Sequence, residues 1–596
     1  MIYHCEDHTC NYWDEGEKLP ERCPQCGRKL LRANEADMTG DDWTALGNTL
    51  WDAEASDKKR MVDCFRKAAY LGSAWGVCNL GICMEQGNGV EADPVQAFWL
   101  YQQAVEMGSL NAVCCLGVCY QYGIGTAPDA KQAAELYCKA AEYGSPRGQM
   151  LLARAFHDGI GVEADAAEAV HWVRAAAYQR YGEGMHRLGV CYEYGDGVEQ
   201  NWERAVHWFR EAAESGVSVA MADLGYCYEK GCGVEQSWAQ AFSWYRRGAE
   251  CGYPVSMSNL GLCYKRGYGV EQNWQEAIKW YEQGAQCGDL QSMHNLARCY
   301  ERGEGVEQNE ERALYWYRRS AEGGNGDAMC NLGRCYERGY GVEQNWQEAV
   351  KWYEQGAQCG HLQSMNNLAC CYEGGEGVEQ NEDRALYWYR RGAEAGSVYC
   401  MFYLGWNYSN GVGVKQNMTE AIRWYTAAAE GGNADAMHNL GWHYDHGEGV
   451  EQDMKKAICW YERAAEQNHP AAMNSLGECY AMGRGVPRDL ETAMEWYRRA
   501  AELGEAMADY NMGWHLEQAG KLSEAYAHYR KAADGNDDSA WWALGRFYEN
   551  GVVVAQDGKE ARRCYETGEK LGSVKCKMRL ARCKLLGIGG RRAKKA

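Results

Sequence analysis

Residues 220–250 read AMADLGYCYEKGCGVEQSWAQAFSWYRRGAE, and this stretch decides the fold. Its first part spaces four apolar residues at i, i+1, i+4 and i+8, as on one face of a helix: Ala220, Met221, Leu224 and Tyr228. Gly225 leaves room for a neighbouring helix. Gly231 and Gly233 follow, and glycine accepts the positive φ values that end a helix and turn the chain. The stretch therefore predicts a helical hairpin.

The second helix of each hairpin is expected to begin at a capping residue thirteen positions after the leucine. Asp, Asn and Ser side chains can accept a hydrogen bond from a free helical N–H. They recur at Asp93, Asp129, Asp165, Asn201, Ser237, Asn273, Asn309, Asn345, Asn381, Asn417, Asp453, Asp489 and Asp557. Trp172 to Trp496 recur every 36 residues on this second helix, and we interpret them as packing residues.

A Leu-Gly or Leu-Ala pair recurs every 36 residues from Leu80 to Leu476, and further anchors on both sides bring the series to sixteen units. One hairpin cannot bury both of its apolar faces, so neighbouring hairpins must stack around a continuous core. The sequence predicts an all-α solenoid over residues 41–586. A small module at 1–33 precedes it, and a basic tail at 587–596 follows it.

The repeated unit AMxNLGxCYExGxGVEQNxxxAxxWYxxAAExG resembles the Sel1-like repeat, a relative of the tetratricopeptide repeat. The resemblance covers residues 41 to about 586. The unit between Met512 and Leu544 lacks the GxGV insertion and is similar to an ordinary tetratricopeptide hairpin. The resemblance implies a right-handed α/α superhelix whose first helices line the concave side. It also implies a scaffold or adaptor that holds partner proteins, rather than an enzyme.

Asparagine recurs just before the anchor leucine, where it would form a ladder along the first helices: Asn79, Asn259, Asn295, Asn331, Asn367, Asn439 and Asn511. Asn carries both a hydrogen-bond donor and an acceptor, so this ladder is a candidate surface for the main chain of an extended peptide. The plainer interpretation is that these residues belong to the solvated face of the repeat.

The composition fits a folded protein with no general affinity for nucleic acid, because the net charge is −21 and phosphate binding depends on clustered Lys and Arg. No apolar run approaches the roughly 20 residues of a membrane span. MIYHCEDHTC lacks the order of a signal peptide, so a cytoplasmic location is expected. Lys570 to Ala596 hold ten Lys or Arg and no acidic residue. We interpret this basic end as a solvated cap, with an acidic partner, a membrane surface or another copy as alternatives.

Ten cysteines of the repeats lie three residues after the anchor, and there they are interpreted as small core residues. These are Cys83, Cys119, Cys191, Cys227, Cys263, Cys299, Cys335, Cys371, Cys479 and Cys583. Some secreted Sel1 proteins link helices through cysteines eight residues apart and have been proposed to bind or hydrolyse penicillins. That spacing is absent here, which weakens the first alternative function, a β-lactamase-like hydrolase. No GxSxG, HExxH or P-loop motif occurs.

Cys5, Cys10, Cys23 and Cys26 form two knuckles in YHCEDHTCNYWDEGEKLPERCPQCGRKLL. Four thiolates suit tetrahedral zinc, and a structural zinc site can fold a segment too short to bury a core. The second knuckle, CPQCG, resembles those of rubredoxin-like and zinc-ribbon modules. Four residues instead of two separate Cys5 and Cys10, which favours zinc over iron.

Three alternatives remain open for this N-terminal module. His8 could replace Cys10 as a metal ligand. The CPQC pair could be a redox pair, although no βαβ pattern surrounds it. Electron transfer through an iron-loaded module is the second alternative function of the chain. The oligomeric state is not indicated by the sequence.

Overall fold

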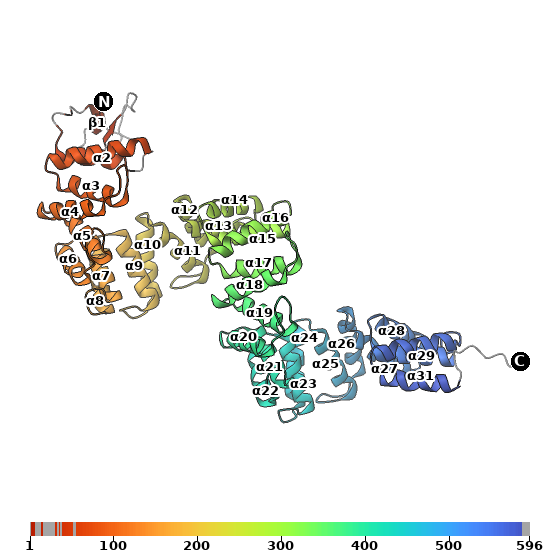
Figure 1. Cartoon of the computed structure of the whole chain (residues 1–596). Helices are drawn as coiled ribbons and strands as arrows, with labels where there is room; N and C mark the ends of the chain where they lie inside the picture. Colours follow the sequence, from red (N-terminus) through yellow and green to blue (C-terminus); the bar gives the residue numbers. More distant parts are fainter. Residues whose placement is uncertain are drawn as a thin grey trace. The chain divides into compact units, whose positions relative to one another are not determined.

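The computed structural model describes residues 2–5, 13–15, 30–32, 35, 38–51 and 55–586. The described residues form three short strands and thirty-one helices (Figure 1). They divide into two compact units, Met1–Gln308 and Asn309–Ala596. No helix within the described ranges is long and apolar enough to cross a membrane.

The first unit begins with a three-stranded antiparallel sheet in the order β2-β1-β3. Its strands are β1 (Ile2–Cys5), β2 (Trp13–Glu15) and β3 (Leu30–Arg32). Cys5 closes β1 and is paired with Leu30 of β3. Cys10, Cys23 and Cys26 lie outside the described residues, as does the basic tail at 587–596. The metal site therefore stays a prediction.

The helices alternate between first and second members of hairpins, with odd numbers for the first helices. In the first unit they are α1 (Gly40–Thr49), α2 (Ala55–Tyr70), α3 (Ala74–Gln86), α4 (Pro94–Glu106), α5 (Leu110–Tyr122), α6 (Ala130–Glu142), α7 (Pro146–Asp158), α8 (Ala166–Tyr178), α9 (Gly182–Tyr194), α10 (Trp202–Glu214), α11 (Ser218–Lys230), α12 (Trp238–Glu250), α13 (Pro254–Arg266), α14 (Trp274–Gln286) and α15 (Leu290–Arg302).

In the second unit they are α16 (Glu310–Glu322), α17 (Gly326–Arg338), α18 (Trp346–Gln358), α19 (Leu362–Gly374), α20 (Glu382–Glu394), α21 (Val398–Asn410), α22 (Met418–Glu430), α23 (Ala434–His446), α24 (Met454–Glu466), α25 (Pro470–Met482), α26 (Leu490–Glu502), α27 (Ala506–Gln518), α28 (Leu522–Asp534), α29 (Asp538–Asn550), α30 (Gly558–Lys570) and α31 (Val574–Leu586).

Local chemistry fixes where these helices begin and end. Gly231 ends α11 at φ 76° and Gly233 turns the chain at φ 69°, as predicted. All thirteen predicted caps accept a backbone N–H of their second helix, as Asn201 does from Arg204. The predicted tetratricopeptide-like unit is α27–α28, where α28 has no side-chain cap.

In most hairpins a tyrosine of the second helix packs against the small residue, usually glycine, that follows the anchor leucine. A Cβ added to Gly225 would lie 2.5 Å from the ring of Tyr245. The second helix of one hairpin also packs on the first helix of the next, for example α8 on α9 and α24 on α25. The predicted all-α solenoid of stacked hairpins is thus confirmed within each unit. The right-handed sense of the superhelix stays a prediction.

Candidate functional site

Equivalent residues of the hairpins are numbered from the anchor leucine, so the asparagine ladder occupies position −1. The buried tyrosine occupies position +21 in most hairpins. Its hydroxyl donates to a Glu or Gln at position +5 over 2.5–2.8 Å in several of them, as Tyr245 does to Glu229. Against this regular packing, one hairpin junction in each unit holds a cavity with a distinct lining.

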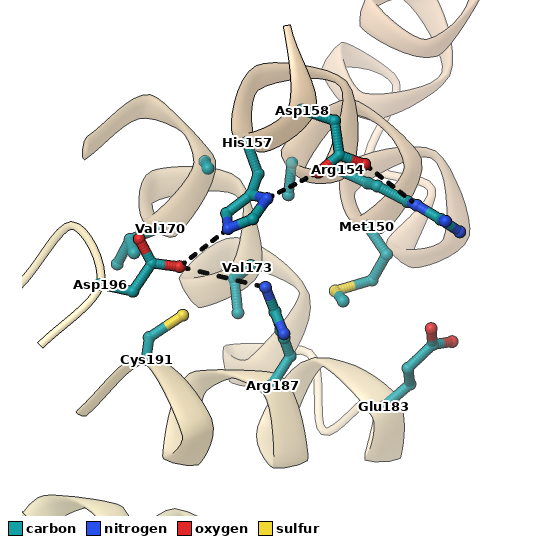
Figure 2. Close-up of a pocket in the computed structure, with 12 residues that line it drawn as sticks. Met150, Arg154, His157, Asp158, Val170, Val173, Glu183, Arg187, Cys191 and Asp196 are labelled. Atoms are coloured by element: carbon teal, nitrogen blue, oxygen red, sulfur yellow. Dashed lines mark hydrogen bonds and ion pairs between the residues drawn. The ribbon is translucent and has the colours of Figure 1, made fainter. Parts of the chain in front are cut away.

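The first cavity lies among α7, α8 and α9 and has a volume of about 380 Å³ (Figure 2). Its floor is apolar and includes Met150, Ala153, Val170 and Val173. Val173 stands at position +21, where most hairpins have tyrosine. Because valine lacks the ring, the space that a tyrosine fills elsewhere is open here.

The rim of the first cavity is a chain of ion pairs. His157 lies between two carboxylates, with Nδ1 2.7 Å from Oδ1 of Asp158 and Nε2 3.2 Å from Oδ2 of Asp196. Arg154 extends the chain at 3.4 Å from Asp158, and Arg187 extends it at 4.0 Å from Asp196. Figure 2 shows these side chains surrounding the apolar floor.

The electrostatics of the first cavity favour binding over nucleophilic chemistry. The hydrogen bond from His157, together with Arg154, holds the pKa of Asp158 below its usual value. Burial raises the pKa of Cys191 to about 11. The thiol of Cys191 is therefore protonated at neutral pH, and a protonated thiol is a poor nucleophile.

The second cavity lies among α21, α22 and α23 and has a volume of about 340 Å³. Two half-exposed tryptophans, Trp406 and Trp442, flank it, and the ladder residue Asn439 forms part of its wall. Tyr425 stays buried beneath it. Burial raises the pKa of Tyr425 to about 12, and hydrogen bonds to Asn439 and Ser409 oppose that rise.

The two cavities occur at the same place in the repeat, between the first helices of successive hairpins. Corresponding residues of the first and second cavities are Arg154 and Trp406 at +2, His157 and Ser409 at +5, Asp158 and Asn410 at +6, Arg187 and Asn439 at −1 of the next hairpin, Cys191 and His443 at +3, and Asp196 and Glu448 at +8. The repeat therefore builds one kind of cavity and varies its lining.

All seven residues of the predicted asparagine ladder are half-buried on the first helices, and Asn439 lines the second cavity. Others bond to position −2 of the preceding hairpin. Nδ2 of Asn511 donates to Oδ1 of Asn474 over 3.0 Å, and Nδ2 of Asn367 donates to Sγ of Cys330 over 3.6 Å. Residues of the asparagine ladder thus join stacked hairpins as well as lining a cavity. Peptide binding by the ladder stays a prediction.

The cysteines three residues after the anchor are all buried and free, so their predicted role as small core residues is confirmed. Cys251, Cys287 and Cys359 are exposed and free. Within the described ranges no three His, Cys, Asp or Glu side chains gather in a way that could hold a metal ion.

The sequence prediction missed Val173 and the charged rim around it. The available signal was the break in the tyrosine column, since positions 137 and 245 are Tyr whereas 173 is Val. The rim residues gave no such signal, because Arg154, His157 and Arg187 take part in no local motif. Only the stacking of successive hairpins brings them together around one cavity.

The Sel1 repeat family matches fourteen segments of the chain, at residues 76–109, 112–145, 146–181, 182–217, 218–253, 254–289, 290–325, 326–361, 362–397, 398–433, 434–469, 470–505, 506–537 and 540–573. A protective antigen of uropathogenic Escherichia coli with an SLR fold is 31% identical; the match covers 81% of this chain and 97% of that one, with a TM-score of 0.47. A Sel1 repeat protein from Oxalobacter formigenes is 29% identical over 41% of this chain and 96% of that one, with a TM-score of 0.37. No curated protein matches the chain.

Proposed function

The chain belongs to the Sel1 repeat family, and we propose that it is a non-catalytic scaffold that binds partner proteins or extended peptides on its first helices. The observation that carries this proposal is the recurrence of one cavity site between successive first helices, with a charged rim in one unit and with two tryptophans among polar residues in the other. Cavities with an apolar base and a few polar groups are typical binding sites.

The second cavity offers the features of a protein-binding surface. Trp406 is 37% exposed and Trp442 is 36% exposed, and tryptophan is enriched among the residues that dominate binding energy. Asn439 lines the same cavity, where its amide can bond to a peptide main chain. The cavity therefore combines apolar anchors with main-chain recognition.

The test replaces Trp406, Asn439 and Trp442 together by Ala and compares cross-linked partners from the source cell with those of the wild type. The matched control replaces Tyr315 and Tyr387, exposed aromatics on the second helices α16 and α20 of the same unit. We expect the first variant to lose its partners and the control to keep them. Equal partner sets for the two variants, each verified as folded, would contradict the proposal.

The N-terminal module is proposed to hold a structural zinc ion through Cys5, Cys10, Cys23 and Cys26. The pairing of β1 with β3 supports this proposal. It places Cys5 opposite Leu30, and Leu30 lies four residues after Cys26 in the sequence. A zinc ion would supply the folding energy that so short a segment lacks. Metal analysis of the purified, reduced chain should find one tightly bound zinc. Iron would favour electron transfer, and no metal would contradict the module.

A further inference from the structure

Each regular hairpin encloses its own tyrosine side chain in a defined environment. The ring of Tyr245 packs on Gly225 at position +1, and the hydroxyl reaches Glu229 at position +5 over 2.8 Å. The residue at +3 of the next hairpin completes the enclosure; the rings of Tyr425 and His443 are 5.7 Å apart. The repeat therefore forms an enclosed site for a phenol ring, and in the regular hairpins the chain's own tyrosine occupies this site.

The α7–α8 hairpin keeps this enclosure but lacks the ring. The first cavity is lined by Ala153 at +1, His157 at +5 and Cys191 at +3 of the next hairpin, the positions that surround the tyrosine elsewhere. Val173 and Ala169 form its base on α8. The vacated space thus has an apolar interior and one polar end.

The polar end matches a hydroxyl group better than a bare ion. Each guanidinium of the rim already faces a carboxylate, Arg154 facing Asp158 and Arg187 facing Asp196, and the lining holds a third carboxylate, that of Glu183. No cationic charge is therefore left over to bind an anion. A phenol hydroxyl donates one hydrogen bond and accepts another. It can donate to Asp196 and accept from His157, whose Nε2 is 3.2 Å from that carboxylate.

We infer that the first cavity binds a tyrosine side chain supplied by a partner protein, in the place where other hairpins bury their own tyrosine. The inference rests on the proposed function, because it assigns a chemical class to what the scaffold binds. The alanine at position 153 does not block the ring. In the second unit Ala369 occupies the same +1 position, and Tyr389 is fully buried in the same cluster.

The experiment labels the methionine methyl groups of the full chain and follows the Met150 resonance by NMR during titration with N-acetyl-tyrosinamide. Met150 lines the cavity, so a bound ring should shift its methyl signal in a saturable manner. N-acetyl-leucinamide should shift it far less. N-acetyl-phenylalaninamide should bind about fivefold more weakly, because it lacks the hydroxyl that Asp196 receives.

The decisive variant is Val173→Tyr, which fills the cavity from within and should weaken probe binding at least about tenfold. Phe209→Tyr is the matched control, because it adds a tyrosine at +21 of the next hairpin and leaves the first cavity unchanged. Val173→Phe serves as the second filling variant should Val173→Tyr not fold.

An unshifted Met150 signal, equal binding of the leucine or phenylalanine probe, or undiminished binding by both filling variants would overturn the inference. None of these results bears on the second cavity. Partner loss in the variant of Trp406, Asn439 and Trp442 tests the scaffold itself, so the two proposals fail separately.

Discussion

The junction of α7 and α9 and the junction of α21 and α23 use the same repeat positions for different chemistry. In the first, Val173 leaves an apolar hollow, and charged residues from Arg154 to Asp196 surround it. In the second, the buried Tyr425 is itself part of the cavity lining, together with the more exposed Trp406 and Trp442. The two junctions therefore differ in what occupies position +21, a valine that lacks a ring in the first and a buried tyrosine in the second.

The largest effect is expected from Tyr425→Val, which would give the second junction the gap of the first. The ring packs on Gly405, Phe402 and His443, so its loss should destabilise the second unit by about 3 kcal/mol. Hydrogen exchange of α21 and α22 measures this locally, which matters because repeat arrays need not unfold in one step. Tyr425→Phe is the control and should cost about 1 kcal/mol. Equal losses for both would contradict a packing role for the ring.

Next in size is the response to acid near the second junction. Burial lowers the pKa of His438 to about 4 from 6.5, with His469 stacked on it at 5.1 Å and Asp435 nearby. The folded chain therefore binds this proton less readily than the unfolded chain. The stabilisation is complete above pH 6.5 and is lost as the pH falls towards 4, by about 2 kcal/mol between pH 6.5 and 5.

His438→Asn isolates this contribution, because Asn474 occupies the same −2 position in the next hairpin. The variant should show a smaller loss of stability between pH 6.5 and 5 in thermal unfolding. An unchanged acid dependence would show that other groups cause it.

A smaller effect of the opposite sign is expected from Val173→Tyr. The new ring would fill the first cavity and place its hydroxyl near His157, so α7–α9 should gain about 1 kcal/mol. Hydrogen exchange of α7 and α8 should slow, whereas that of α11 and α12 should not. Faster exchange in α7 would show that the rim cannot accommodate the ring.

The smallest effect is expected from Asp196→Asn, which removes the carboxylate shared by His157 and Arg187. These side chains are between about a third and two-fifths exposed, so the loss should be about 0.5 kcal/mol at low ionic strength. It should disappear in 1 M salt, where the screening length is about 3 Å. Glu448, at the equivalent position of the second cavity, forms no ion pair with any described residue, so Glu448→Gln should change the melting temperature by less.

Much of the fold follows from local chemistry that the sequence states directly. The caps from Asp93 to Asp557, the paired glycines and the spacing of the anchors all depend on interactions within one hairpin, so one sequence is enough to predict them. The asparagine ladder is likewise visible in the sequence, because it follows the same spacing. Its hydrogen bonds to position −2 could not be predicted, because residues 37 apart meet only when hairpins stack.

The sequence by itself determined the helices, their turns and the repeat that stacks them, since those features come from backbone geometry and from apolar spacing along one helix. Only the tertiary structure decided that Val173 opens a cavity and that Arg154, His157, Arg187 and Asp196 meet around it. The sequence alone shows only that position 173 lacks an aromatic ring. Whether a cavity results depends on how the side chains of neighbouring helices pack around that position.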